Sequence, residues 1–181
     1  MSLLSYNHLV RLVEKGIITN VKPEQINAAS IDLTLGGKVL VEDGEHAGNR
    51  VVSLRARDKL PMKEQDITEF GVTMNPGDFV LAQTQQLFNL PNYISAEYKL
   101  KSSMARIGLE HLNAGWCDAG WHGSALTLEL KNMTQEHFIH LQAGDAIGQI
   151  VFFTHDPVPE DRSYAARGRY NNDTSVSGVK P

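Results

Sequence analysis

The sequence predicts a mainly β fold, built as a distorted barrel or as two packed sheets, with one short helix near its N-terminus. Two observations support this prediction. Short apolar runs recur at close spacing from Ile67 onward, and turn sequences such as those at 75–78 and 89–92 separate them. Residues 29–35 and 126–130 each alternate apolar and polar side chains, which is typical of half-buried strands.

The first predicted element is a helix over residues 5–15, for which Ser5 is the expected N-terminal cap. Leu9, Leu12 and Val13 fall on one face of such a helix. We therefore expect it to pack against the outside of a sheet rather than to carry chemistry.

The strands follow in order along the chain. The first covers residues 29–35, and Gly36-Gly37 is expected to turn it into a second strand at 38–41, forming a hairpin. Asp32, on the polar face of the first strand, is expected to satisfy loop donors, with a catalytic role as the alternative. Further strands are predicted at residues 79–82, 93–100, 126–130, 138–141 and 147–153.

Two segments lack strand periodicity. Residues 50–63 are rich in Lys and Arg, which indicates a solvated, mobile segment, with phosphate capture as the alternative. From His155 onward, Pro, Arg and Tyr residues lie among small and polar ones. Such a tail often frays, but its Arg and Tyr residues would also suit an arm that closes over a phosphorylated ligand. We expect one domain over residues 1–181, with about 155–181 as this C-terminal arm.

Composition excludes several classes of function. The net charge of −4 argues against a nucleic-acid binder, which would present a basic face. The sequence contains neither an 18-residue apolar run nor a basic-then-apolar leader, so we expect no membrane span and no secretion. The single cysteine, Cys117, fits a reducing cytoplasm, and it does not meet the paired-cysteine requirement of zinc-dependent deaminases.

Residues 100–130 combine three features of a ligand site. Residues 101–106 are a run of cations and hydroxyls, the donors that an anion needs. Two small-residue turns at 114–121 carry two indoles and one carboxylate, and Thr127 and Glu129 share one face of the strand that follows. The closeness of these features along the chain predicts one site that contains all three.

This stretch resembles the deoxycytidine triphosphate (dCTP) deaminases, which belong to the trimeric dUTPase superfamily. The resemblance covers the chain from the first helix to about Tyr170. It is carried, in this order, by AASIDLTLG at 28–36, KSSMAR at 101–106, AGWCDAGWHG at 114–123, LTLEL at 126–130 and AGDAIGQ at 143–149.

The resemblance implies a dUTPase-like fold and a homotrimer with active sites between subunits. It implies that Glu129 activates the water that attacks carbon 4 of cytosine, with Ser102 and Arg106 also at the reacting centre. No protein metal ligand and no zinc are implied, and Mg²⁺ would enter with the triphosphate of dCTP. The implied substrate-binding residues are Lys101, Ser103, Ala114, Asp118, Trp121, Thr127, Leu128, Gln149, Tyr164 and Arg169.

The residues themselves also admit simpler interpretations. Residues 101–106 could be an ordinary helix cap with solvated cations, and Glu129 could be the polar side of an amphipathic strand. If Glu129 faces a pocket instead, partial burial would raise its pKa toward that of a general base. Asp118 could bond its own turn, bind the sugar hydroxyl, or hold the water that attacks the α-phosphate.

Four positions depart from the family pattern, and one of them is Asn113, where a threonine is common. Lys101 replaces a common arginine, which keeps the charge but loses the bidentate fork. One extra residue precedes Glu129, so a bulge before Leu126 is required if Glu129 is to face the site. Asp173 stands where a glutamine usually contacts phosphate, and its charge would repel a triphosphate unless Mg²⁺ intervenes.

The sequence therefore favours metal-independent deamination of dCTP to dUTP and ammonia. The Gly115-Trp116 pair is more similar to family members that also cleave the triphosphate and form dUMP. Two alternatives stay open: a dUTPase without deaminase activity, which Glu129 argues against, and a non-catalytic nucleotide-sensing module on the same fold.

Overall fold

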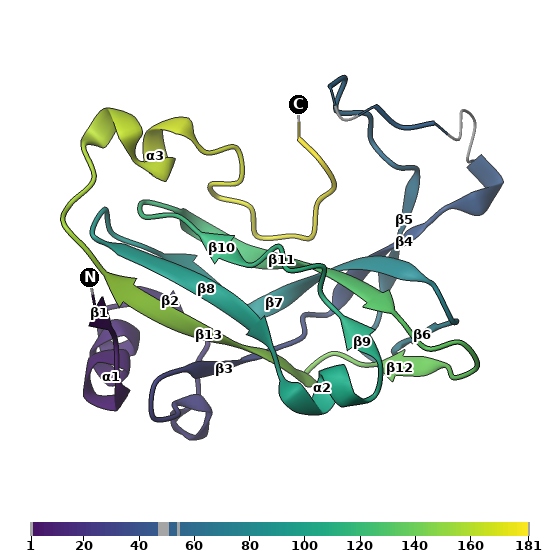
Figure 1. Ribbon diagram of the computed structural model, residues 1–181, viewed down its shortest axis with the longest axis horizontal. Helices are drawn as coiled ribbons and strands as arrows, with labels where there is room; N and C mark the ends of the chain where they lie inside the picture. The colour runs from purple at the N-terminus through teal and green to yellow at the C-terminus, as the bar shows by residue number, and fades with distance from the viewer. Residues whose placement is uncertain (1, 47–50, 54, 181) are drawn as a thin grey trace.

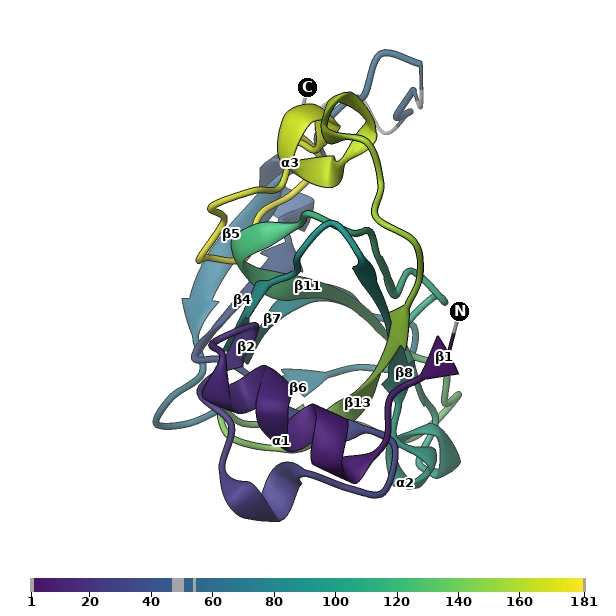
Figure 2. The ribbon, with the colours of Figure 1, turned by 90° about the vertical axis from the view of Figure 1, so that its left-hand side faces the viewer.

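The computed structural model describes residues 2–46, 51–53 and 55–180, and it confirms the mainly β fold. Its strands are antiparallel and form two main sheets (Figure 1). Viewed from the side, the strands curve around a shared interior, and the N-terminal helix lies beside it (Figure 2). None of the described helices has the length and apolar character needed to cross a membrane.

The first sheet is centred on β13 (Ala146–Thr154) and β8 (Ile94–Leu100), which pair along the whole of β8. Three shorter strands complete it: β1 (Ser2–Leu3), β3 (Ile31–Thr34) and β10 (Trp116–Cys117).

The second sheet is centred on β7 (Phe79–Asn89) and β11 (His122–Asn132). The strands around them are β2 (Ile18–Thr19), β4 (Lys38–Glu42), β5 (Met62–Asp66) and β9 (Leu109–Glu110). A small separate ribbon joins β6 (Val72–Met74) to β12 (Ile139–Leu141).

The expected hairpin at Gly36-Gly37 is wrong. β3 pairs with β13 in the first sheet, whereas β4 pairs with β5 and β7 in the second. The two glycines therefore form a crossing between sheets. Gly36 donates its N–H to the Gln83 carbonyl at 2.7 Å, and a Cβ at this position would lie 2.7 Å from the Gln83 Cγ atom. Only a glycine allows so close an approach of the two segments.

The N-terminal helix, α1 (Tyr6–Glu14), forms as predicted, and Leu9 and Leu12 are buried in the core. Ser5 occupies the N-cap position but makes no side-chain capping bond. Its carbonyl instead accepts from the N–H groups of His8 and Leu9. Apolar burial therefore fixes this helix more than its cap does.

The remaining helices are short: α2 (Ser102–Arg106), α3 (Tyr164–Arg167), and single 3₁₀ turns at Pro23–Gln25, Gly44–His46 and Glu160–Arg162. After β13 the chain passes through α3 and then runs across β11 on the side opposite α2 (Figure 1). Of the basic segment at 50–63, Arg50 lies outside the described residues. Met62 and Lys63 begin β5, so that end of the segment is a strand rather than a mobile loop.

Candidate active site

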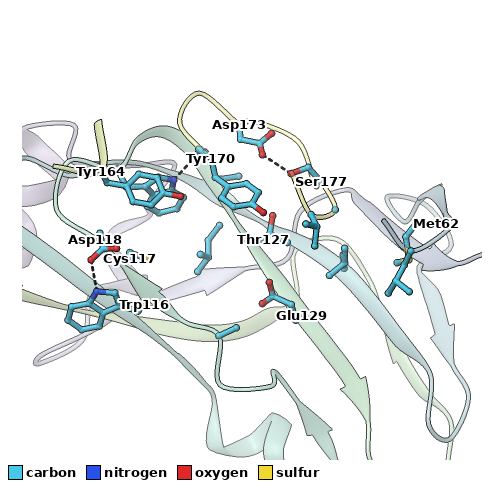
Figure 3. A pocket seen from close by; sticks show the side chains of 18 of the residues that line it. Met62, Trp116, Cys117, Asp118, Thr127, Glu129, Tyr164, Tyr170, Asp173 and Ser177 are labelled. Atoms are coloured by element: carbon cyan, nitrogen blue, oxygen red, sulfur yellow. Dashed lines mark hydrogen bonds between the residues drawn. The ribbon is translucent and has the colours of Figure 1, made fainter. Parts of the chain in front are cut away.

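A cavity of about 450 Å³ lies over β11, between the 114–121 loop and the C-terminal tail (Figure 3). Its β-sheet side includes Phe79, Leu81, Thr127 and Glu129. Ala114, Trp116, Asp118 and Trp121 line it from the loop, and the tail contributes Tyr164, Tyr170, Asp173 and residues 177–179.

Glu129 faces this cavity because β11 contains a bulge. The register changes between His122 and Ser124, where Gly123 is an extra residue with a φ of +65°. The bulge expected before Leu126 is therefore confirmed. A second register shift follows between Ala125 and Thr127, after which the pairing with β7 is regular. Thr127 and Glu129 then point into the cavity, whereas Leu128 is buried in the core.

Burial changes the acid–base behaviour of Glu129. Loss of solvation raises the pKa of its carboxyl to about 7, and a backbone hydrogen bond opposes this rise. A carboxyl with this pKa is half ionised near neutral pH, where it can both accept a proton and return it. That property is the one expected of a general acid–base group in the cavity.

Asp118 is held in place by its neighbour. The Trp116 indole donates Nε1–H to Asp118 Oδ1 at 2.9 Å, and both side chains line the cavity (Figure 3). The Trp116 ring stacks on Phe153, with centroids 6.3 Å apart. This bond orients the carboxylate, and its donor is a side chain of the same turn rather than the turn's backbone.

The Trp121 side chain contacts both the hydrophobic core and the C-terminal tail. Its ring stacks on Phe88 with centroids 5.2 Å apart, and its Nε1–H donates to the Tyr170 carbonyl at 2.9 Å. Ser124 Oγ donates to the same carbonyl at 2.6 Å. These bonds fix the backbone of Tyr170, whose side chain lines the cavity together with Asp173 and residues 177–179.

The cation-rich run at 101–106 lies elsewhere in the fold. Ser102, Ser103 and Arg106 lie on α2, which Figure 1 places at the far end of the sheets from the tail, and none of them lines the cavity. Lys101 instead pairs with Asp32, with 2.6 Å between Nζ and Oδ2. Within a single copy of the chain, residues 101–106 therefore do not meet Glu129 in this cavity, and their joining it from a second copy stays a prediction.

Three further candidates also lie outside the cavity lining. Leu128 faces the core, and Arg169 is exposed to solvent. Gln149 lies on β13, where its Oε1 accepts a hydrogen bond from Ser30 Oγ at 3.2 Å. Asp32, which also accepts from Asn27 Nδ2 at 2.9 Å, acts as the structural carboxylate that the sequence predicted.

In the part of the chain that the structure describes, the charged side chains that line the cavity are all acidic. Four carboxylates line it, from Asp58, Asp118, Glu129 and Asp173, whereas its described lining contains no Lys, Arg or His. Among the described residues, no group of three or more His, Cys, Asp or Glu side chains could hold a metal ion. Taken alone, this cavity suits a neutral base and sugar better than a phosphate chain.

Several lining residues carry no signal in the sequence that would predict a site. Leu60 and Met62 belong to a segment that was expected to be solvated, and Phe79 and Leu81 read as ordinary strand residues. Tyr170 was noted only as part of a tail rich in Arg and Tyr. No spacing rule in the sequence connects these segments with β11.

Comparison with known proteins agrees with this geometry. A sequence model described as dCTP deaminase-like matches residues 3–155. A Methanospirillum hungatei protein named "dCTP deaminase, dUMP-forming" is 37% identical over 145 residues, which cover 78% of this chain and 76% of that one. A Nanoarchaeum equitans protein of the same name is 35% identical over 92% of this chain and 90% of its own.

The fold also has a match among solved structures. The 2′-deoxycytidine 5′-triphosphate deaminase from Agrobacterium tumefaciens aligns with a TM-score of 0.67 at 23% identity, over 84% of this chain. The alignment spans about half (48%) of that longer chain, and at this identity it supports the fold alone. The motifs in the sequence, the match over most of the chain and the shared fold together show that the chain belongs to the dCTP deaminase-like family.

Proposed function

We propose that this protein deaminates dCTP hydrolytically and then cleaves the product to dUMP and pyrophosphate. The single observation that carries the proposal is Glu129, a carboxyl facing a cavity with a pKa raised to about 7. The relatives that match most of the chain are named as dUMP-forming dCTP deaminases, which supports the same reaction. The single cysteine fits a cytoplasmic setting.

In the first step, the Glu129 carboxylate takes a proton from water, and the oxygen of that water attacks C4 of cytosine. The proton passes to the ring nitrogen N3, and the hydroxyl now on C4 gives its proton to the C4 amino group, which leaves as ammonia. A carbonyl remains at C4, so the product is dUTP. A positioned general base of this kind contributes on the order of 10²–10⁴ in rate.

In the second step, Asp118 orients and activates a water for attack on the α-phosphate. The bond to the β-phosphate breaks, and pyrophosphate leaves together with its bridging oxygen. The Trp116 N–H, 2.9 Å from Asp118, supports this assignment because it keeps the carboxylate in the cavity.

The triphosphate requires cations that the cavity lining lacks. We propose that Lys101, Ser102, Ser103 and Arg106 of a second copy supply them, in a homotrimer with sites between subunits. The acidic lining also favours a nucleotide that carries Mg²⁺ on its phosphates, because the metal reduces the negative charge of the chain. The protein's own residues then hold the base and sugar.

Incubation of the purified protein with dCTP and with dUTP, followed by nucleotide separation and ammonia assay, tests this function. Ammonia and dUMP from dCTP are expected. dUMP from dUTP without ammonia from dCTP would instead identify a dUTPase, and no turnover of either nucleotide would indicate a sensing module.

A further inference from the structure

The C-terminal tail is attached to the bulged end of β11. The Asn172 N–H donates to the His122 carbonyl at 3.0 Å, and the Ala125 N–H donates to the Asp173 carbonyl at 2.9 Å. The Asp173 N–H donates to Ser124 Oγ at 3.1 Å. These bonds place the Asp173 side chain at the wall of the cavity, as Figure 3 shows.

The Asp173 carboxylate is already paired within the tail. Its Oδ2 accepts from Ser177 Oγ at 2.7 Å and pairs with Lys180 Nζ at 2.7 Å. The Lys180 ammonium also lies 5.3 Å from the centre of the Tyr170 ring, and the Lys180 N–H donates to the Tyr170 hydroxyl at 3.3 Å. Asp173 and Tyr170, which both line the cavity, therefore hold the Lys180 ammonium next to the lining.

This arrangement matters because the described cavity lining contains four carboxylates and no cation. Lys180 is two-thirds buried and Asp173 more so, with side-chain exposures of 33% and 14%, so solvent screens the pair only in part. A phosphate chain offers the ammonium more charge and more acceptor oxygens than one carboxylate does.

We propose that Lys180 is a ligand of the nucleotide's phosphate chain and that Asp173 is its counter-ion in the free protein. Nucleotide binding then exchanges the Asp173–Lys180 ion pair for a phosphate–Lys180 pair. The inference rests on the proposed function and adds a cation from the same chain as Glu129. In the free protein, the tail thus supplies the cation that compensates the charge of Asp173.

The test measures binding by calorimetry in the Glu129→Gln background, which prevents turnover. The ligands are Mg·dCTP, deoxycytidine and Mg·tripolyphosphate. The variants are Lys180→Met, Asp173→Asn and the double mutant, with Lys38→Met as a matched control. Lys38 forms a 2.6 Å ion pair with Glu64 on exposed strands and does not line the cavity.

Lys180→Met is expected to weaken Mg·dCTP and Mg·tripolyphosphate binding by about 10-fold or more, the usual loss for a charged hydrogen bond, and to leave deoxycytidine binding unchanged. Unchanged deoxycytidine binding also reports that the cavity is intact. Asp173→Asn, which frees the ammonium, is expected to tighten Mg·dCTP binding several-fold, and this gain should vanish in the double mutant. Lys38→Met should behave as the parent.

The assignment of Lys180 as a phosphate ligand would be overturned if Lys180→Met bound Mg·dCTP and Mg·tripolyphosphate as tightly as the parent. Weaker Mg·dCTP binding by Asp173→Asn would also overturn it, because that result would indicate that Asp173 binds the metal rather than holding Lys180. The proposed function fails by a different result, the absence of ammonia release from dCTP by the wild type. Tripolyphosphate binding tests Lys180 without dependence on that reaction.

Discussion

The Trp116 indole and the Asp118 carboxylate form a hydrogen bond of 2.9 Å inside the cavity that contains Glu129. The indole is itself held by stacking on Phe153 of β13. A carboxylate that lies at the cavity wall and keeps one orientation can position a water, whereas a freely rotating turn aspartate cannot do so reliably. We therefore propose this pair as the structural basis for the second step of the reaction.

Asp118→Asn should let dUTP accumulate, because an amide cannot accept the proton of a water aimed at the α-phosphate. Trp116→Phe keeps the ring but loses the N–H, so it should lower the share of dUMP while ammonia release continues. A time course by ion-exchange chromatography measures both products. Wild-type protein that forms dUTP without pyrophosphate would contradict the second step. Equal loss of both steps in Asp118→Asn would show that Asp118 only binds the sugar.

The variants Arg106→Ala and Glu129→Gln should each be inactive when expressed alone. When the two are co-expressed, activity should be recovered. In the proposed trimer, one chain supplies Glu129 and its neighbour supplies Arg106, so random assembly leaves about one quarter of the sites with both residues intact. Specific activity near that fraction is expected. The control co-expresses Arg106→Ala with Lys101→Met. Both substitutions lie in the part of the site that one and the same chain supplies, so no mixed trimer has an intact site and no recovery is expected. Failure of the first pair to recover would argue against sites shared between chains.

The free energy of unfolding should depend on pH through Glu129. Burial raises the pKa of its carboxyl from 4.5 to about 7, so the native state binds more protons than the unfolded state between these values. The contribution of Glu129 to the free energy of unfolding is therefore greatest below pH 4.5, and it is lost as the pH rises through 7. Glu129→Gln should therefore exceed wild type in stability at pH 8, by roughly 1–3 kcal/mol, and by much less at pH 5.

Urea unfolding at both pH values, at one protein concentration, measures this difference. A stability gain of equal size at pH 5 and pH 8 would show that the substitution acts through packing. No gain at pH 8 would indicate that the Glu129 carboxylate is better solvated or paired than this structure shows.

Treatment with a zinc chelator, followed by restoration of Mg²⁺, should leave deamination unchanged. The chain has one cysteine, whereas the zinc deaminases require a paired-cysteine motif. Elemental analysis provides the control. Stoichiometric zinc that tracks activity through removal and reconstitution would require a different source for the attacking hydroxide.

The sequence predicted those features that depend on local pattern. The alternation at 126–130 placed Thr127 and Glu129 on one face, and the extra residue before Glu129 indicated the bulge that Gly123 forms. Leu9 and Leu12 likewise identified the buried face of α1. Such signals are readable because the side-chain periods of strands and helices follow from backbone geometry.

Features that depend on partners distant in the chain could not be read in this way. Gly36-Gly37 resembles a hairpin turn, but which sheet residues 38–42 join depends on β5 and β7. Residues 101–106 lie near Glu129 in sequence and yet belong to the opposite end of the sheets. The sequence showed the charge of Asp173 but not its pairing with Lys180, which requires the tail to fold back on Tyr170.

Ammonia release from dCTP by Glu129→Gln tests the central claim most directly, measured in a preparation free of host deaminase. The amide keeps the shape of the side chain but cannot take a proton from water. The variant should lose roughly 10²–10⁴ in the rate of deamination while it still binds Mg·dCTP. The wild-type rate should rise with pH through about 7, as the carboxyl ionises. Deamination by the variant at a rate close to that of the wild type would contradict the assignment of Glu129 as the base.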